Sequence, residues 1–292
     1  MYTKSYVLIL TILCPFLSLK AQSPVNGFMQ KKGNGSVVLS HNFESYNSVF
    51  LVPEKITGVP IFNKITINST SVYGTYGLSD KLNIVLNVPY IKAQGAASEA
   101  VLNNLNYRNT QSGLQDVSAY LKYKALTVNR EKVAFNLIGA VGVKTPLGNY
   151  TVDEGLQSIV SIGNRATSVN ALMIGLLRSN SGLFASGQAG YCLRNGQVPN
   201  AFMSEFKAGL IQPHFYFDAF IANQTSLSGT DILAEGFEGF FPSTKVNYTR
   251  IGLNVFVPIY KQFGLCAGSS TYIDGRNLGQ STSYYGAISV SF

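Results

Sequence analysis

The sequence predicts an all-β fold, a transmembrane antiparallel β-barrel of about 12 strands that follows a cleaved signal peptide. Three observations lead to this prediction. Apolar and polar residues alternate with a period of two along many segments, which is typical of half-buried strands. Short turns and longer loops alternate along the chain, as they do in outer-membrane barrels. The chain also finishes on an alternating stretch, "YYGAISVSF", whose last residue is Phe292.

The first stretch, "MYTKSYVLILTILCPFLSLKAQS", has the layout of a secretory signal peptide. Lys4 precedes an apolar run that begins at Val7, and small residues follow near Ala21. The run is too short for a membrane-spanning helix. We therefore expect three parts: a signal peptide at residues 1–21, a periplasmic N-terminal segment at 22–34 and the barrel at 35–292.

The composition excludes several other classes of protein. Charged residues make up only 12% of the chain, whereas aromatic residues, all of them Tyr or Phe, make up another 12%. The formal net charge is +8, but the basic residues are scattered and form no patch for nucleic acid. Beyond the signal only Cys192 and Cys266 remain, so the chain is no disulfide scaffold. No apolar run of about 18 residues follows the signal, which argues against a spanning helix.

The alternation is clearest in "LNIVLNVPY", where Leu82, Ile84 and Leu86 share one face and Asn83 and Asn87 share the other. Helical spacing is not sustained anywhere between the alternating segments. We expect strands at residues 35–46, 64–78, 82–91, 114–126, 133–145, 167–178, 183–193, 201–211, 215–223, 245–259, 263–272 and 283–292.

The connections between these strands give independent information. Short links follow the even-numbered strands, at residues 79–81, 127–132, 180–182, 212–214 and 260–262. Mostly longer ones follow the odd-numbered strands, at residues 47–63, 92–113, 146–166, 194–200, 224–244 and 273–282. This asymmetry is typical of outer-membrane barrels, and an even strand count places both termini on the periplasmic side.

A soluble β-sandwich would alternate too, but its outward face would be polar. Here the apolar phase of the cleaner strands carries no charge, and a Lys or Arg facing lipid at mid-bilayer would cost about 2–4 kcal/mol. The loop asymmetry and the terminal Phe favour the membrane barrel. The opposite phase is then expected to line the lumen: Asp116, Tyr120, Lys122, Lys124, Lys144, Glu205, Lys207, Tyr216, Asp218, Arg250, Asn254 and Phe256.

The C-terminal strand resembles the signature by which bacterial outer-membrane proteins are recognised for insertion. Its outward phase consists of Tyr284, Gly286, Ile288, Val290 and Phe292. Phe292 suits the periplasmic membrane interface, where aromatic rings are common. We expect this strand to close onto the first one, because closure removes both exposed sheet edges.

Several stretches resemble the family labelled "MetA-pathway of phenol degradation". They are "TYGLSDKLNIVLNVPYI" (75–91), "SGLQDVSAYLKYKAL" (112–126), "GVKTPLGNY" (142–150), "SIGNRATSV" (161–169) and "LFASGQAGYCLRNG" (183–196). These barrels are distantly similar to the long-chain fatty-acid transporters. The resemblance implies an outer-membrane protein of a Gram-negative bacterium that moves small hydrophobic or aromatic compounds. Residues 22–34 are too short to imply the hatch of the fatty-acid transporters.

Catalytic motifs are nearly absent, since the chain has only two histidines and no HExxH, nucleophile elbow, P-loop or CxxC. We expect His214 to be a solvated turn residue and His41 to face lipid or the interface. Ser40 and His41 are neighbours that point to opposite faces, so they cannot form a nucleophile–base pair. The sequence therefore predicts no enzyme, cofactor or metal site. Cys192 and Cys266 fall inward on strands that are not neighbours, and we expect free thiols.

Two alternatives remain open for the lumen. Its charges, with Lys207 flanked by Glu205 and Asp218, could brace a filled interior or line a narrow path for a solute, since twelve strands lie between filled and open barrels. Residues 224–244 could fold inward as a constriction, cap the mouth, or form a disordered surface loop. The expected function is passive or facilitated passage of small hydrophobic or aromatic molecules; the alternative is a non-transporting structural or docking barrel. The expected partners are outer-membrane lipid, the barrel-insertion machinery and a small hydrophobic solute, without nucleic acid.

Overall fold

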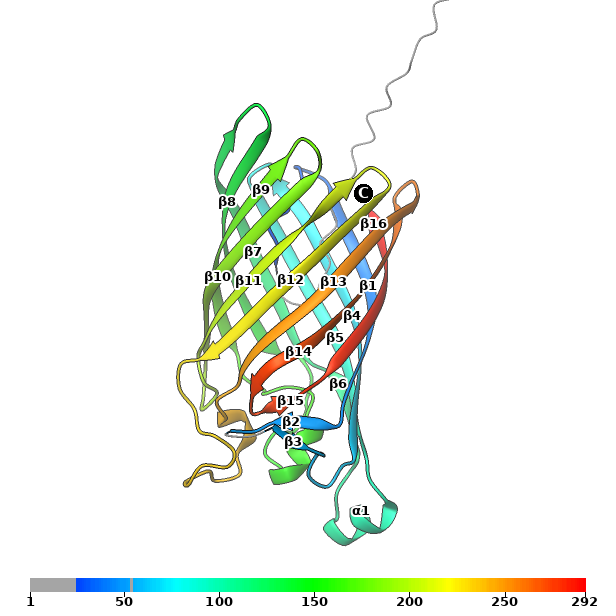
Figure 1. Ribbon diagram of the computed structural model, residues 1–292, viewed down its shortest axis with the longest axis vertical. Helices are drawn as coiled ribbons and strands as arrows, with labels where there is room; N and C mark the ends of the chain where they lie inside the picture. Colours follow the sequence, from blue (N-terminus) through cyan, green and yellow to red (C-terminus); the bar gives the residue numbers. More distant parts are fainter. Residues whose placement is uncertain (1–24, 53–54) are drawn as a thin grey trace, which may run out of the picture.

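The computed structural model describes residues 25–52 and 55–292, which form a closed antiparallel β-barrel (Figure 1). The predicted signal peptide, residues 1–21, lies outside the described residues. Among the described residues, the main sheet has thirteen strands at twelve wall positions, because β6 and β7 follow one another along β5 on either side of Gln115. The wall strands are β1 (Gly35–Tyr46), β4 (Lys64–Ser79), β5 (Leu82–Ala96), β6 (Thr110–Leu114), β7 (Asp116–Asn129), β8 (Val133–Pro146), β9 (Ser168–Ser179), β10 (Leu183–Arg194), β11 (Ala201–Gln212), β12 (Phe215–Ser226), β13 (Asn247–Tyr260), β14 (Phe263–Arg276) and β16 (Thr282–Ser291).

The first and last strands close the barrel. β1 pairs with β16 in an antiparallel register that runs from Ser36 opposite Ser291 to Ser45 opposite Thr282. One residue beyond the Ser36–Ser291 pair, the Gly35 amide donates to the Phe292 carbonyl at 2.8 Å, and the Phe292 amide donates back to the Gly35 carbonyl at 2.9 Å. The closing strand therefore leaves no open sheet edge at this seam.

The predicted all-β barrel of twelve strands is confirmed, and each predicted range overlaps a wall strand. The main difference is that several strands run further than the alternation indicated. β5, for example, continues from residue 91 to Ala96 and pairs Lys92 and Gln94 with Ser112 and Thr110 of β6. In this part of β5 the outward-facing Lys92 and Gln94 are exposed and polar, while the small residues Ala93 and Gly95 are buried on the other face. The outward face is no longer apolar, so the pattern that marked the strand in the sequence is missing.

The two ends of the barrel differ, as the connection lengths predicted. One end, here called the turn end, carries the short turns between β4 and β5, β7 and β8, β9 and β10, β11 and β12, and β13 and β14 (Figure 1). The opposite loop end carries elements that the sequence did not predict: β2 (Ser48–Phe50), β3 (Lys55–Thr57), β15 (Leu278–Gly279), α1 (Glu99–Leu105) and the 3₁₀ turns η1 (Gly155–Val160) and η2 (Phe241–Ser243). No helix in residues 25–52 or 55–292 is long and apolar enough to cross a membrane.

The two faces of the wall have opposite character. On β16, Tyr284 and Ile288 are 61% and 51% exposed on the outside, whereas Ser289 is fully buried inside. Asp218 and Asn254 are likewise fully buried on the inside. A soluble sandwich buries its apolar residues and exposes its polar ones, so this distribution is the reverse. An apolar outer face around a polar interior is what a bilayer requires of a barrel.

Candidate solute pathway

The loop end of the lumen contains a cavity of about 670 Å³, here called the outer cavity. Most of its lining side chains are polar, and they come from nearly every wall strand. Its charged members are Glu44, Asp116, Lys144, Arg194 and Arg250. Three tyrosine rings also line it: Tyr120, Tyr272 and Tyr285. The cavity therefore offers a small molecule both hydrogen-bonding groups and aromatic surface.

Inward-facing glycines let aromatic rings lie against the wall. A Cβ added at Gly142 would lie 2.2 Å from the Tyr120 ring on the neighbouring strand, and one added at Gly264 would lie 2.0 Å from the Phe256 ring. Each ring therefore occupies the space that a side chain would need on the next strand. Rings laid along the wall project less far into the lumen and leave room for the cavities.

A buried ionic group, here called the central cluster, occupies the middle of the lumen and consists of Glu205, Lys207, Tyr216, Asp218 and Asn254. Lys207 Nζ lies 3.8 Å from a carboxylate oxygen of Glu205 and 3.8 Å from one of Asp218. The register explains this, because Gly209 of β11 faces Asp218 of β12 and Lys207 is therefore its diagonal neighbour. The cross-strand pairing that the sequence suggested for Lys207 is present.

Hydrogen bonds join the members of the central cluster to one another and to two further strands, β10 and β16. Asp218 accepts from the Tyr216 hydroxyl at 2.5 Å and from Asn254 Nδ2 at 2.7 Å. The Tyr285 hydroxyl donates to Asn254 Oδ1 at 2.8 Å, and Gln188 Nε2 donates to Glu205 Oε1 at 2.9 Å. These hydrogen bonds offset part of the free-energy cost of burying the carboxylates of Asp218 and Glu205.

Residues 25–30, here called the inserted segment, lie inside the lumen. Val25, Phe28 and Gln30 are all at least nine-tenths buried. The Phe28 ring packs edge-on against Phe184 at 5.3 Å and Tyr216 at 6.1 Å between ring centroids. The sequence placed residues 22–34 in a periplasmic segment, and it gave no indication that part of this range enters the barrel.

Two buried polar side chains hold the backbone of the inserted segment. Lys122 Nζ donates to the Phe28 carbonyl at 2.6 Å, and Asn83 Nδ2 donates to the Gln30 carbonyl at 3.3 Å. Gly77 allows the chain to pass close to the wall, since a Cβ there would lie 2.1 Å from the Lys31 carbonyl oxygen. The segment is thus attached by specific contacts and reduces the free cross-section of the turn end.

A second cavity of about 510 Å³, the inner cavity, lies beside the inserted segment at the turn end. Phe28, Met29 and Gln30 form part of its lining, together with residues of β7, β8, β9 and the last turn. Its charged members are Lys31, Lys124, Arg178 and Lys261. The inserted segment therefore borders the inner cavity and packs against the central cluster through Tyr216.

The structure places the twelve predicted lumen residues as follows. Asp116, Tyr120, Lys144 and Arg250 line the outer cavity, and Lys124 lines the inner one. Lys122 holds the inserted segment, and Phe256 packs in the same apolar cluster as Val25. The remaining five form the central cluster: Glu205, Lys207, Tyr216, Asp218 and Asn254. That these side chains meet a passing solute stays a prediction.

Several residues of this region were not singled out from the sequence. Gln188 and Tyr285 share the inward phase of their strands, so the alternation could have indicated them. Tyr150 could not have been found, because it lies in a loop without periodicity. Its side chain is nevertheless buried, and its hydroxyl donates to Asp116, which also pairs with Lys144 at 3.1 Å.

The loop at residues 224–244 is fastened to the neighbouring hairpin. Asp231 accepts from Arg276 Nε at 2.7 Å and from Arg276 Nη2 at 2.5 Å, and Asn277 Nδ2 donates to the same carboxylate at 2.8 Å. Of residues 224–244, all of which are described, only Gln224 lines the outer cavity. The Phe237 and Phe241 rings instead pack on each other, 5.4 Å apart.

The ion pair between Asp231 and Arg276 should weaken in acid. The hydrogen bonds from Arg276 lower the pKa of Asp231 from 3.8 to about 2. Because the folded pKa lies below the unfolded one, the stabilisation is complete above about pH 4 and is lost as the pH falls towards 2. We expect Asp231→Asn to speed proteolytic cleavage of the loop at pH 7, and Glu235→Gln, an exposed change in the same loop, to leave it unchanged. Equal cleavage of both variants would contradict the fastening role.

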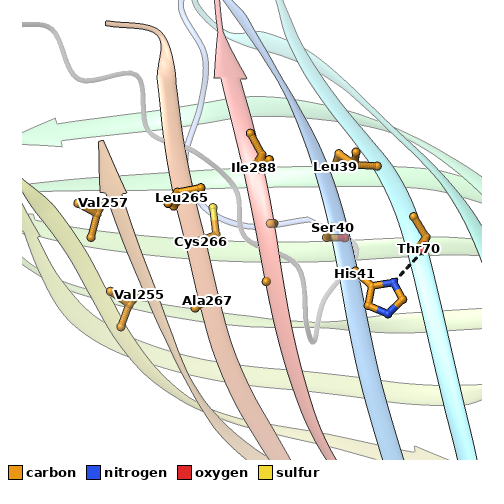
Figure 2. Close-up of a pocket in the computed structure, with 12 residues that line it drawn as sticks. Leu39, Ser40, His41, Thr70, Val255, Val257, Leu265, Cys266, Ala267 and Ile288 are labelled. Atoms are coloured by element: carbon orange, nitrogen blue, oxygen red, sulfur yellow. Dashed lines mark hydrogen bonds between the residues drawn. The ribbon is translucent and has the colours of Figure 1, made fainter. Parts of the chain in front are cut away.

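The predicted exclusion of a Ser40–His41 pair is consistent with the geometry. His41 lies on the outer face, where its Nδ1 is 2.9 Å from Thr70 Oγ1, as Figure 2 shows. The Ser40 hydroxyl instead contacts that of Ser71 at 2.8 Å. Beside His41 the outer surface has a hollow of about 570 Å³ lined mainly by apolar residues (Figure 2). Cys192 and Cys266 are buried free thiols.

No family model and no curated protein matches the chain. Among solved structures, the COG4313 outer membrane channel from Pseudomonas putida F1 is similar over 90% of this chain and 97% of that one, with 13% identity and a TM-score of 0.70. The translocator domain of autotransporter NalP from Neisseria meningitidis gives 10% identity and a TM-score of 0.47, over 90% of this chain and 89% of that one. A Pseudomonas aeruginosa FadL homologue gives 8% and 0.39, over 89% of this chain and 90% of that one.

Only the first of these likenesses is close enough to support an argument, and at 13% identity it concerns the fold. The chain has the fold of a bacterial outer-membrane β-barrel. The bacterial outer membrane is the location that this fold and the apolar outer face support. Membership of the phenol-degradation family stays a prediction.

Proposed function

We propose that the protein is an outer-membrane channel through which small molecules pass without an energy source in the barrel itself. The outer cavity carries this proposal, because a closed barrel that served only as a support would have no need of a polar chamber of about 670 Å³. The inner cavity at the turn end provides a matching space on the other side of the central cluster. A solute moving between them would cross the part of the lumen that the inserted segment narrows.

The lining favours solutes that carry polar groups as well as an apolar or aromatic part. Burying an unpaired polar group costs roughly 1–3 kcal/mol in proteins, so a pure hydrocarbon would leave the groups of the outer cavity unsatisfied. Tyr120, Tyr272 and Tyr285 offer ring surface beside these polar groups. We therefore narrow the expected class from small hydrophobic or aromatic molecules to small aromatic molecules with polar substituents. Outer-membrane lipid and the insertion machinery remain the expected partners of the outer face and of the C-terminal strand.

A non-transporting barrel is the second candidate, and the inserted segment is the observation that favours it. Phe28 and its contacts reduce the free lumen at the turn end, and a permanently closed barrel would act only through its loops. The two candidates differ in whether any solute crosses the purified protein.

Liposome swelling separates these candidates. We expect phenylalanine and glycine to enter liposomes that contain the purified protein faster than they enter empty liposomes, and raffinose to be excluded by its size. A Phe28→Ala variant should increase the rate for both amino acids. If neither protein raised the rate of any solute above that of empty liposomes, the channel would be rejected in favour of the structural barrel.

A further inference from the structure

The charges along the lumen are unevenly distributed. The inner cavity is lined by four basic side chains, and none of its lining residues, all of them described, is Asp or Glu. Its basic members lie on four parts of the chain: the stretch that follows the inserted segment, strand β7, strand β9, and the turn before β14. They are Lys31, Lys124, Arg178 and Lys261. A concentration of one sign of charge at a narrow mouth focuses its potential on ions that enter.

Acidic residues near the turn end do not offset this charge within the cavity. Asp80, in the turn between β4 and β5, accepts a hydrogen bond from the Lys32 amide at 2.9 Å and is not part of the lining. Glu131, in the turn between β7 and β8, is exposed and is not part of the lining either. The four basic side chains therefore set the sign of the potential at this mouth.

The charged residues in the rest of the lumen do not reverse the positive sign of the electrostatic potential. In the central part, Lys122 and Lys207 balance Glu205 and Asp218 in formal charge. The outer cavity has three basic members against two acidic ones. One of those acids, Asp116, already pairs with Lys144 at 3.1 Å.

Arg194 is a basic group of the outer cavity whose hydrogen-bond acceptors are uncharged. Its guanidinium donates to the Pro199 carbonyl at 2.8 Å and to Gln224 Oε1 at 3.3 Å, both of which are uncharged acceptors. Its charge is thus held in place by neutral groups, which orient it without cancelling it. A carboxylate is the ligand chemistry that a guanidinium held in this way recognises best.

From this distribution we infer that the pathway selects anions, and that its preferred solutes are small aromatic carboxylates. This inference rests on the proposed channel and names its substrate class. Rings of Lys or Arg select anions in pores because they lower the energy of an anion and raise that of a cation. The aromatic part of such a solute would contact the tyrosine rings of the outer cavity, while its carboxylate would follow the basic groups towards the inner cavity.

The reversal potential of the full-length protein in a planar bilayer tests this inference. Under a potassium chloride gradient we expect the permeability ratio of chloride to potassium to be about five or more. Lys124→Gln combined with Lys261→Gln should lower this ratio at least about twofold, and the effect should shrink in high salt, which screens charges. The matched control is Lys81→Gln combined with Lys132→Gln, which removes the same charge from exposed turn residues outside the cavity lining.

A second measurement compares two aromatic ions of similar size and opposite charge. We expect benzoate to carry more current than benzylammonium through the wild-type protein, and the double variant of Lys124 and Lys261 to reduce the difference. A channel that conducts but prefers potassium to chloride, or benzylammonium to benzoate, would overturn the inference and leave the proposed channel standing. Absence of any conductance, in the wild type and in Phe28→Ala alike, would overturn both.

Discussion

Phe28→Ala is expected to raise the ratio of open to closed channels by about a hundredfold or more. Truncation of a buried Phe to Ala typically costs about 3–5 kcal/mol, and each 1.4 kcal/mol changes an equilibrium about tenfold. Phe28 is 6% exposed, and its ring contacts Phe184 and Tyr216. The lost packing falls on the inserted state of the segment alone, since the barrel wall closes without it. The whole free-energy difference should therefore shift the equilibrium from the inserted state towards the displaced state, in which the turn end is open.

Planar-bilayer recording measures this change directly. Phe206→Ala is the matched control, because it makes the same truncation on the outer face of β11, where the ring is 54% exposed. We expect that variant to conduct like the wild type. If Phe28→Ala left the conductance and the open-state occupancy unchanged, the inserted segment would not be what restricts passage.

Lys207→Met is expected to lower the free energy of unfolding by about 3–5 kcal/mol. The methionine would leave the buried carboxylates of Glu205 and Asp218 without the charge that lies 3.8 Å from both. A carboxylate stranded in a low-dielectric interior is far costlier than a neutral pair, so the double variant Glu205→Gln with Lys207→Met should recover part of the loss.

The midpoint and slope of urea unfolding, followed by the gel mobility of the folded barrel, give this difference. The chain has no Trp, so tryptophan fluorescence does not report on it. Lys132→Met, in an exposed turn, serves as the control and should change the stability by less than about 0.5 kcal/mol. A loss for Lys207→Met no larger than that of the control would mean that the two acids are adequately stabilised by Tyr216, Asn254 and Gln188.

The sequence predicted the wall of the barrel well because the wall obeys a local rule. Each wall residue faces either outward or inward, and a period of two records that choice in the residue types. The same rule brought most of the lumen residues to the correct face, and the pairing of Lys207 with Glu205 and Asp218 followed from the strand register. The last residues of β5 still alternate between exposed and buried, but their outward face is polar rather than apolar, so this strand end was missed.

The inserted segment could not be predicted for a different reason. "VNGFMQ" has no periodicity, and its burial results from space that twelve strands leave between them. Only the assembled wall brings Lys122 and Asn83 to the carbonyls of Phe28 and Gln30, which lie far from them in the sequence. The loop-end elements around Tyr150 and Asp231 were missed for the same reason, because contacts between distant parts of the chain determine their conformation.

The seam between β1 and β16 has a consequence for biogenesis. It joins residues at opposite ends of the chain, so no partial product of synthesis can complete the wall, and the entropy of closing so large a loop must be met in the last step. Only four residues separate the inserted segment, residues 25–30, from β1, the strand that forms this seam. Pairing of β1 with β16 and insertion of residues 25–30 into the lumen therefore involve neighbouring parts of the chain. If the strands pair first, the newly closed barrel has an open lumen until the segment enters; if the segment enters first, the lumen is already narrowed when the barrel closes.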